Sequence, residues 1–554
     1  MTDRETTLQD IFPACRRLVD SATWPLLTSN VDSHLEGEAA WDRFSEIVVS
    51  LAGTLNLPDY LGALAELEFA LHRCARMRDL ASLDVEKRQL NPSLRILESQ
   101  WIGLPGVLAS KHGQDPAIVP GCDVILVWFD PKRGKTRVQS ADDATLTGLK
   151  IVSDGLHVGK AALEYRVPLS SLHQAVDKAI SKGLVLAPKS RLRRNPAIFE
   201  AKEKHLQRFM TARVFTLQWH ITQACDLHCR HCYDRSARDV MTLDQAIFVL
   251  DELEGFCRDR NVRAKVTFTG GNPLMYPDFD ALYLETANRG FPVSILGNPT
   301  TRQRLENLLA VQRPTHYQVS LEGLREHNDH IRQAGYFDRV MKFMPLLKDL
   351  GIPSQVMLTL TRDNMDQVLQ LGKLLSGVTD LFTFNRLSAV GEGAALLMPT
   401  PEEYEHFLRT FLQECSDNAV LGLKDNLINI IREEEGLKSF GGCTGFGCGA
   451  AFNFVTLLSD GEVHACRKFP SFLGNVFEQG LSRCYDSQAG QRYRAGSAGC
   501  RGCELLPSCG GCQAVASSLG LDPHIYRDPY CFRGQAGRRA SASDISCSAP
   551  SDLK

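Results

Sequence analysis

The sequence predicts an α/β fold, namely a partial barrel of six βα units with a mainly helical region before it and a cysteine-rich domain after it. Strand-like runs alternate with helical patterns over residues 210–400. Parallel strands need crossovers of this length, and six units form an open version of the eight-unit barrel. Of the 18 cysteines, three lie at 225–232, and eight form a second pattern within 443–531.

Bulk properties narrow the class of protein. A chain of 554 residues is long enough for roughly three or four domains. The net charge of −3 gives no general argument for binding nucleic acid or an anionic membrane. The amino-terminal residues are charged, and no apolar run approaches the length that spans a bilayer. We therefore expect a cytoplasmic protein with no membrane segment, whose cysteines bind metal rather than form disulfides.

Composition and patterning divide the chain into six regions. We expect a helical region at 1–118, a hairpin with a winged-helix-like module at 119–200, the barrel at 210–400, a helical linker at 401–440, the cysteine-rich domain at 441–535 and a disordered tail at 536–554.

The region before the barrel carries a hairpin pattern and three helical patterns. Two extended runs within Asp123–Gln139 flank the turn residues Asp130 to Gly134, and the helical patterns follow. This order resembles a winged-helix module. Such a module could bind DNA or serve only as structure, but we favour capture of a leader peptide on a strand edge or in a helix groove.

The barrel prediction rests on six strand-like runs, each followed by a helical pattern such as Leu243–Phe256. In a barrel of this kind the loops after the strands converge over one mouth, where chemistry takes place. The predicted strands are 214–221, 264–269, 292–296, 316–321, 354–361 and 379–387.

Three cysteines follow the first strand at Cys-x-x-x-Cys-x-x-Cys spacing. Cys225, Cys229 and Cys232 could hold three irons of a cubane cluster, leaving the fourth iron free to bind a small molecule. A zinc loop or three unrelated cysteines could show the same spacing. The motif resembles that of the radical S-adenosylmethionine (SAM) enzymes, and the resemblance implies a 4Fe–4S cluster bound by these three cysteines and SAM.

Further strand ends carry motifs that resemble SAM contacts of the same family. Gly270-Gly271-Asn272-Pro273 resembles the family's Gly-Gly-Glu-Pro motif, with Asn272 in place of the acid, which exchanges a charge-assisted hydrogen bond for a neutral one. By the resemblance, a hydroxyl and a carboxylate bind the ribose and an arginine meets the SAM carboxylate. The expected cofactor-binding residues are Gly270, Gly271, Asn272, Pro273, Asn298, Ser320, Glu322 and Arg332, with Asn385 and Arg386 as further candidates.

The carboxyl-terminal cysteines resemble a SPASM domain, an extension of some radical SAM enzymes that carries two auxiliary 4Fe–4S clusters. The resemblance implies two sets of four ligands, with one departure: two residues separate Cys509 from Cys512, where the family commonly has three. Zinc knuckles are the alternative, since Cys-x-x-Cys repeats bind zinc readily. One set is Cys443, Cys448, Cys466 and Cys512, and the other is Cys500, Cys503, Cys509 and Cys531.

The resemblance implies an oxidoreductase that removes a substrate hydrogen with a 5′-deoxyadenosyl radical. Sulfatase-maturating relatives place an aspartate after the third auxiliary cysteine, whereas Arg467 follows Cys466 here. The chain is more similar to ribosomal-peptide maturases, including the selenobiotic group that acts on cysteine-containing repeats. We expect a precursor peptide as substrate, oxidative crosslinking or thioether formation, and ferredoxin or flavodoxin as reductant. A sulfatase-maturase-like enzyme, an iron–sulfur DNA-binding regulator and a zinc-stabilised scaffold are the alternatives.

Overall fold

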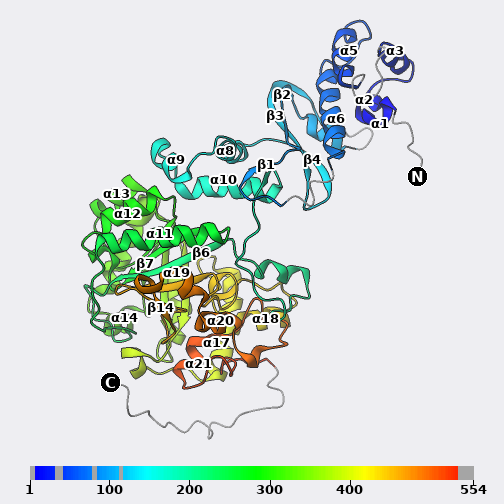
Figure 1. Ribbon diagram of the computed structural model, residues 1–554. Coiled ribbons are helices and arrows are strands. Elements are labelled where there is room, and N and C mark those ends of the chain that lie inside the picture. Colours follow the sequence, from blue (N-terminus) through cyan, green and yellow to red (C-terminus); the bar gives the residue numbers. More distant parts are fainter. Residues whose placement is uncertain (1–6, 32–40, 78–83, 111–115, 534–554) are drawn as a thin grey trace. The chain divides into compact units, whose positions relative to one another are not determined.

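The computed structural model describes residues 7–31, 41–77, 84–110 and 116–533. The chain forms two compact units, residues 1–189 and residues 190–554 (Figure 1). Among the described residues, no helix is both long and apolar enough to cross a membrane. The expected tail at 536–554 lies outside the described residues.

The first unit combines a helical group, a three-stranded antiparallel sheet and three further helices. Buried apolar side chains such as Phe12, Phe44 and Leu64 join the helical group to the sheet in one core. The Asp142 side chain accepts a hydrogen bond from Thr145 N and so begins the first of the later helices. The elements are α1 (Leu8–Ile11), α2 (Pro13–Leu18), α3 (Thr23–Ser29), α5 (Phe44–Leu51), α6 (Leu61–Ala75), β1 (Gln89–Leu90), β2 (Arg95–Ile102), α7 (Leu104–Ala109), β3 (Val119–Asp130), β4 (Lys135–Ser140), α8 (Asp143–Ser153), α9 (Val158–Tyr165), α10 (Leu169–Lys182) and β5 (Val185–Leu186).

The predicted hairpin and the three helices after it are present as β3, β4, α8, α9 and α10. The prediction of a helical region up to residue 118 is wrong at β2, which pairs antiparallel with β3 and is an edge strand of the sheet. The sequence of β2 alternates between side chains with more and less exposure, which is the period of a half-buried strand.

The second unit is built on a nine-stranded sheet that contains all six predicted strands. The strands β6 to β11 are parallel neighbours in chain order, and helices connect them. Buried residues on these strands, such as Phe215, Leu217 and Trp219, pack under α11, which lies along β6 and β7 (Figure 1). The parallel strands are β6 (Val214–Thr222), β7 (Arg263–Gly270), β8 (Val293–Leu296), β9 (Tyr317–Ser320), β10 (Ser354–Leu360) and β11 (Leu381–Arg386).

Helices follow the parallel strands as the periodicity predicts. A capping box between Thr242 and Gln245 begins α11, and a second between Thr400 and Glu403 begins α17. The helices are α11 (Leu243–Asp259), α12 (Phe279–Asn288), α13 (Arg302–Val311), α14 (Arg325–Ile331), α15 (Tyr336–Asp349), α16 (Val368–Leu375), α17 (Pro401–Asp417), α18 (Ile428–Glu434), α19 (Val476–Asp486), α20 (Gln488–Ala495) and α21 (Gln513–Ser518).

The cysteine-rich region is joined to the barrel sheet, which the sequence did not predict. β12 (Phe454–Leu458) pairs parallel with β6, and β13 (Glu462–His464) and β14 (Phe472–Asn475) extend the sheet antiparallel. Cys466 lies between β13 and β14, and the first cysteine motif follows β6. The shared sheet therefore brings the two cysteine groups to neighbouring loops.

Candidate functional site

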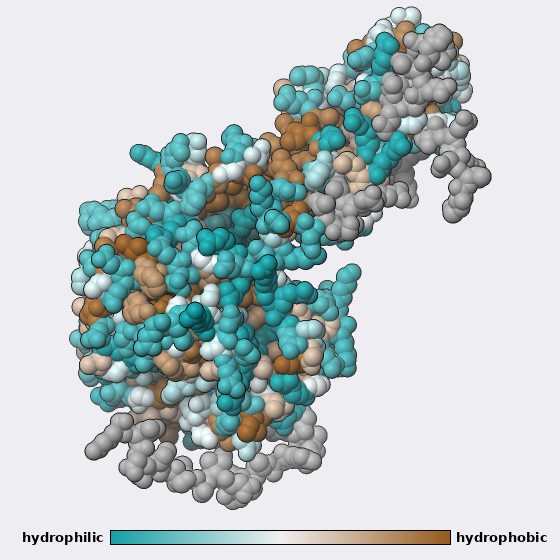
Figure 2. Space-filling view, viewed as in Figure 1, coloured by the Kyte–Doolittle hydropathy of each residue, from teal (hydrophilic) through white to brown (hydrophobic). Residues whose placement is uncertain are grey.

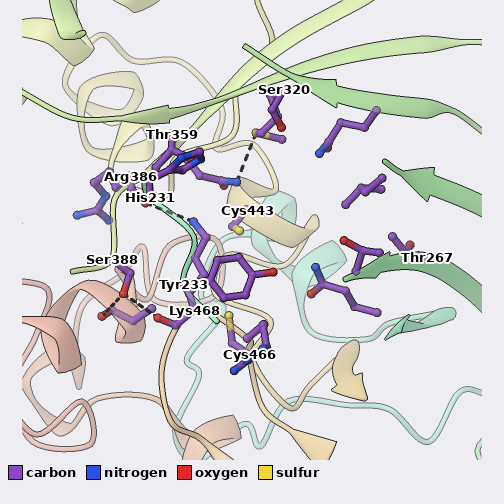
Figure 3. Close-up of a pocket in the computed structure, with 18 of the residues that line it drawn as sticks. His231, Tyr233, Thr267, Ser320, Thr359, Arg386, Ser388, Cys443, Cys466 and Lys468 are labelled. Carbon is purple, nitrogen blue, oxygen red and sulfur yellow. Dashed lines mark hydrogen bonds between the residues drawn. The ribbon is translucent and has the colours of Figure 1, made fainter. Parts of the chain in front are cut away.

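The carboxyl ends of the parallel strands and the cysteine-rich loops surround one cavity of about 980 Å³. Figure 3 shows Cys443, Cys466 and Lys468 around the same space as His231 and Tyr233. Alternating residues of the strands face it; on β6, for example, Thr216 and Gln218 line the cavity while Leu217 lies in the core. The cavity therefore combines strand ends with both cysteine groups.

Cys225, Cys229 and Cys232 line this cavity as free thiols. Burial raises the pKa of each thiol. Cys232 raises the pKa of Cys225 further, and Cys225 and Cys232 both raise that of Cys229. Three thiols this close resist simultaneous ionisation unless a cation binds them. Their arrangement therefore fits a positively charged iron site with a face open to the cavity.

The glycine pair after β7 presses against the backbone of the cysteine loop. Gly271 N donates to Thr222 O at 2.8 Å, and Asn272 N donates to Ala224 O at 2.7 Å. A Cβ on Gly271 would lie 2.2 Å from the Ala224 carbonyl oxygen, and Gly270 has φ of +125°. Only glycine satisfies both the contact and the backbone angle. Both glycines line the cavity, so the same peptide groups position the loop and face the site.

Asn272 and Asn298 hold a carboxylate that the sequence did not single out. The Asn272 amide donates to Asp226 Oδ1 at 3.1 Å, the Asn298 amide donates to the same oxygen, and Arg339 donates to Asp226 Oδ2 at 3.0 Å. Asn298 lines the cavity, whereas Asn272 and Pro273 lie behind its wall. Asp226 directly follows Cys225 in the sequence, and this adjacency is the one sequence feature that could have marked Asp226 as a residue of the site.

Glu322 is buried, with its carboxylate engaged inside the protein rather than facing the cavity. Arg332 donates to Glu322 Oε1 at 2.6 Å, the Thr359 amide donates to Oε2 at 2.7 Å, and the His231 ring lies 3.2 Å from Oε1. Burial raises the pKa of Glu322, but His231 and Arg332 outweigh burial and hold it at about 2. Ser320 and Arg332 do line the cavity. The geometry makes Glu322 a support for Arg332 and His231, a role that its sequence neighbours did not indicate.

The eight carboxyl-terminal cysteines form two neighbouring sets. Within the first, burial, together with the neighbouring thiols Cys512 and Cys443, raises the pKa of Cys448 to about 11 and that of Cys466 to about 12. These four thiols line the cavity. Within the second, burial, together with the neighbouring thiols Cys531 and Cys503, raises the pKa of Cys500 to about 12. The members of the second set do not line the cavity.

Buried arginines fasten these loops to the barrel. Arg386, at the end of β11, pairs with Asp425 at 2.8 Å and Asp528 at 2.6 Å, and Asp528 accepts from Cys512 N at 2.8 Å. Arg467, which stands where sulfatase maturases have an aspartate, pairs with Asp234 in the first cysteine loop. In the described part of the chain, no three His, Cys, Asp or Glu side chains are placed as ligands of one metal ion. Neither cysteine group is therefore a preformed single-ion site.

Comparisons with known proteins match this layout. Residues 219–375 match the radical SAM superfamily, and residues 448–513 match the SPASM iron–sulfur cluster-binding domain. The chain is 30% identical to the mycofactocin maturase MftC of Mycolicibacterium smegmatis, over 57% of this chain and 82% of that protein. It is 26% identical to the AdoMet-dependent heme synthase of Methanosarcina barkeri, over 58% and 97%. The crystal structure of Streptococcus suis SuiB bound to the precursor peptide SuiA has a TM-score of 0.48 and 17% identity, over 74% and 96%.

Proposed function

Because this chain belongs to the radical SAM superfamily and carries a SPASM domain, we propose that it modifies a ribosomally made precursor peptide. The modification is oxidative crosslinking or thioether formation at cysteine-containing repeats. The observation that carries the proposal is the single cavity of about 980 Å³, which Cys225, Cys229 and Cys232 share with Cys443 and its set. A cavity of this size lies at the upper end of the range for small-molecule sites, which leaves room for a peptide segment beside SAM.

The family identity implies a 4Fe–4S cluster with SAM and auxiliary clusters. When bound, these groups supply a 5′-deoxyadenosyl radical that takes a substrate hydrogen atom and an acceptor for the remaining electron. We assign the first cluster to Cys225, Cys229 and Cys232, and the two auxiliary clusters to the two sets of four cysteines.

The chain's own residues position and shield these groups. Arg332 offers a guanidinium to the SAM carboxylate, and Glu322 fixes its orientation from behind the wall. Gly270 and Gly271 bring peptide groups up to the ligand, while Asp226 steadies the loop that begins at Cys225. The protein's contribution is therefore positioning and exclusion of water.

The first unit offers a surface for peptide recognition. Ile96 and Ile102 on β2 and Val119 on β3 are each nearly half exposed, and apolar side chains gather over these strands (Figure 2). An exposed edge strand can pair with an extended peptide. We therefore assign residues 119–200 together with β2 to capture of the leader peptide. An Ile96→Lys substitution should lower modification of the full-length peptide, whereas Val49→Lys, at another exposed apolar position, should not.

Anaerobic co-expression with a candidate cysteine-containing precursor peptide tests the function. A ferredoxin or flavodoxin of the cytoplasm would supply the electron. High-resolution mass spectrometry should show a loss of two hydrogens for each modification, and the Cys225→Ala variant should leave the peptide unchanged. An unmodified peptide, together with active formation of deoxyadenosine, would rule out this substrate.

A further inference from the structure

Most cations that line the cavity already have a carboxylate partner. Arg332 pairs with Glu322, Arg386 with two aspartates, Arg467 with Asp234, and Arg235 with Glu392. Lys424 and Lys468 differ, since no carboxylate among the described residues forms an ion pair with either ammonium group. Both side chains are partly buried, where a charge without a carboxylate partner costs free energy, so these two lysines favour an anion beyond the carboxylates of the described residues.

The environment of Lys424 shows where such an anion would bind. Its Nζ reaches Met357 Sδ on β10 at 3.9 Å, and Asn385 Nδ2 and Thr383 Oγ1 approach the same sulfur at 3.4 and 3.3 Å. A thioether is a weak acceptor, so three donors converge on the sulfur where no stronger acceptor among the described residues takes their hydrogen bonds. Lys424, Asn385 and Met357 all line the cavity.

Lys468 adds a second positive charge to the same region. It follows Cys466 by two positions, and its Nζ donates to the Arg386 carbonyl oxygen at 3.4 Å. The two lysines lie near enough for their charges to oppose one another electrostatically. An anion between them would relieve that repulsion as well as accept their hydrogen bonds.

The thiols of the first auxiliary set are the competing explanation for both lysines. Cys443 and Cys466 interact electrostatically with Lys424, so its charge offsets part of theirs once they ionise. That role does not account for the position of the ammonium group against Met357 on the barrel strand, nor for the convergence of Asn385 and Thr383 there.

We propose that Lys424, Lys468 and Asn385 form a subsite that binds a carboxylate of the peptide substrate. The carboxylate belongs either to an aspartate or glutamate side chain or to the carboxyl terminus of the peptide. This assignment rests on the proposed function and adds to it a substrate that presents an acidic group beside the reacting residue.

Equilibrium dialysis of radiolabelled probes against the anaerobically reconstituted holoenzyme tests the subsite. The probes are acetyl-Gly-Glu-Gly-amide, acetyl-Gly-Gln-Gly-amide, acetyl-Gly-Gly-Gly with a free carboxylate, and glutarate. At least one carboxylate peptide should bind on the order of tenfold more tightly than the glutamine peptide. The stronger of the two carboxylate peptides identifies a side-chain or terminal group. Lys424→Met should abolish the preference, Lys424→Arg should keep most of it, and the exposed control Lys342→Met should keep all of it.

Two results would overturn the subsite. One is equal binding of the charged and neutral peptides. The other is a preference for the carboxylate peptide that both Lys424→Met and Lys468→Met retain, together with a shifted reduction potential of an auxiliary cluster in these variants. That result would mean that the lysines only balance the charge of the cluster. Lysine-dependent binding of glutarate without binding of any peptide would instead contradict the peptide substrate and leave the carboxylate subsite standing.

Discussion

Removing the Glu322 carboxylate should destabilise the second unit by about 3 kcal/mol. Lowering a carboxyl pKa from its ordinary 4.5 to about 2 corresponds to about 3 kcal/mol. This value agrees with the cost of about 3–5 kcal/mol for breaking a buried ion pair by removing one partner. Only 11% of the Arg332 side chain is exposed. In Glu322→Gln, Arg332 therefore retains a buried positive charge but loses the Glu322 carboxylate that balances it.

Hydrogen exchange of peptides covering β10 over a urea series measures this loss in the second unit alone. The iron-free, reduced protein at pH 7 avoids differences in cluster content between variants. The matched control is Glu326→Gln, an exposed position on α14 that should change the stability by less than about 0.5 kcal/mol. A loss in Glu322→Gln no larger than that of the control would refute the assignment of Glu322 as the support for Arg332 and His231.

The same carboxylate predicts a dependence of stability on pH. The pKa of Glu322 is lower in the folded protein than in the unfolded chain, so its stabilisation is fully present above about pH 4.5 and is lost as the pH falls towards about 2. Wild type should therefore lose about 3 kcal/mol more than Glu322→Gln across that window. Parallel losses in the two proteins would contradict the depressed pKa.

Three further substitutions test the loop that carries the first cysteines. Cys225→Ala should abolish cleavage of SAM while leaving roughly two thirds of the iron, because the two closed auxiliary clusters remain. Iron and sulfide counts measure this content, and loss of nearly all the iron would contradict clusters that assemble independently. Gly271→Ala should displace the loop and remove about one cluster's iron, since its Cβ would meet a carbonyl oxygen at 2.2 Å. Gly255→Ala should keep the full content, because its Cβ would come only within 3.7 Å of the Arg258 side chain, an ordinary contact. Asp226→Asn should raise the dissociation constant for SAM by on the order of tenfold through loosening of the Cys225 loop, and an unchanged constant in equilibrium dialysis would count against that role.

The sequence predicts the parallel strands and the two cysteine patterns because these features are local. A run such as Val214–Ile221 identifies its own strand by its apolar residues, and the spacing of Cys225, Cys229 and Cys232 fixes a shared loop whatever surrounds it. The family resemblance then gave the division of the eight later cysteines into two sets of four.

Other features depend on contacts between distant segments, which the local pattern does not encode. β12 pairs with β6 across more than two hundred residues, and that pairing brings Cys466 to the first cysteine loop. Glu322 turns away from the cavity because His231 and Arg332 reach it from other segments. Lys424 belongs to no periodic pattern or motif, and it stands out only because no carboxylate among the described residues forms an ion pair with it.

Transfer of deuterium from a labelled peptide tests the central claim most directly. The holoenzyme would be incubated anaerobically with SAM, a low-potential reductant and a precursor peptide deuterated at its carbon-bound positions, and the deoxyadenosine would be analysed by mass spectrometry. Hydrogen abstraction from the peptide predicts deoxyadenosine that carries deuterium, in step with the loss of two hydrogens from the modified peptide. Deoxyadenosine without deuterium, formed at the same rate whether or not the peptide is present, would contradict a peptide-modifying function.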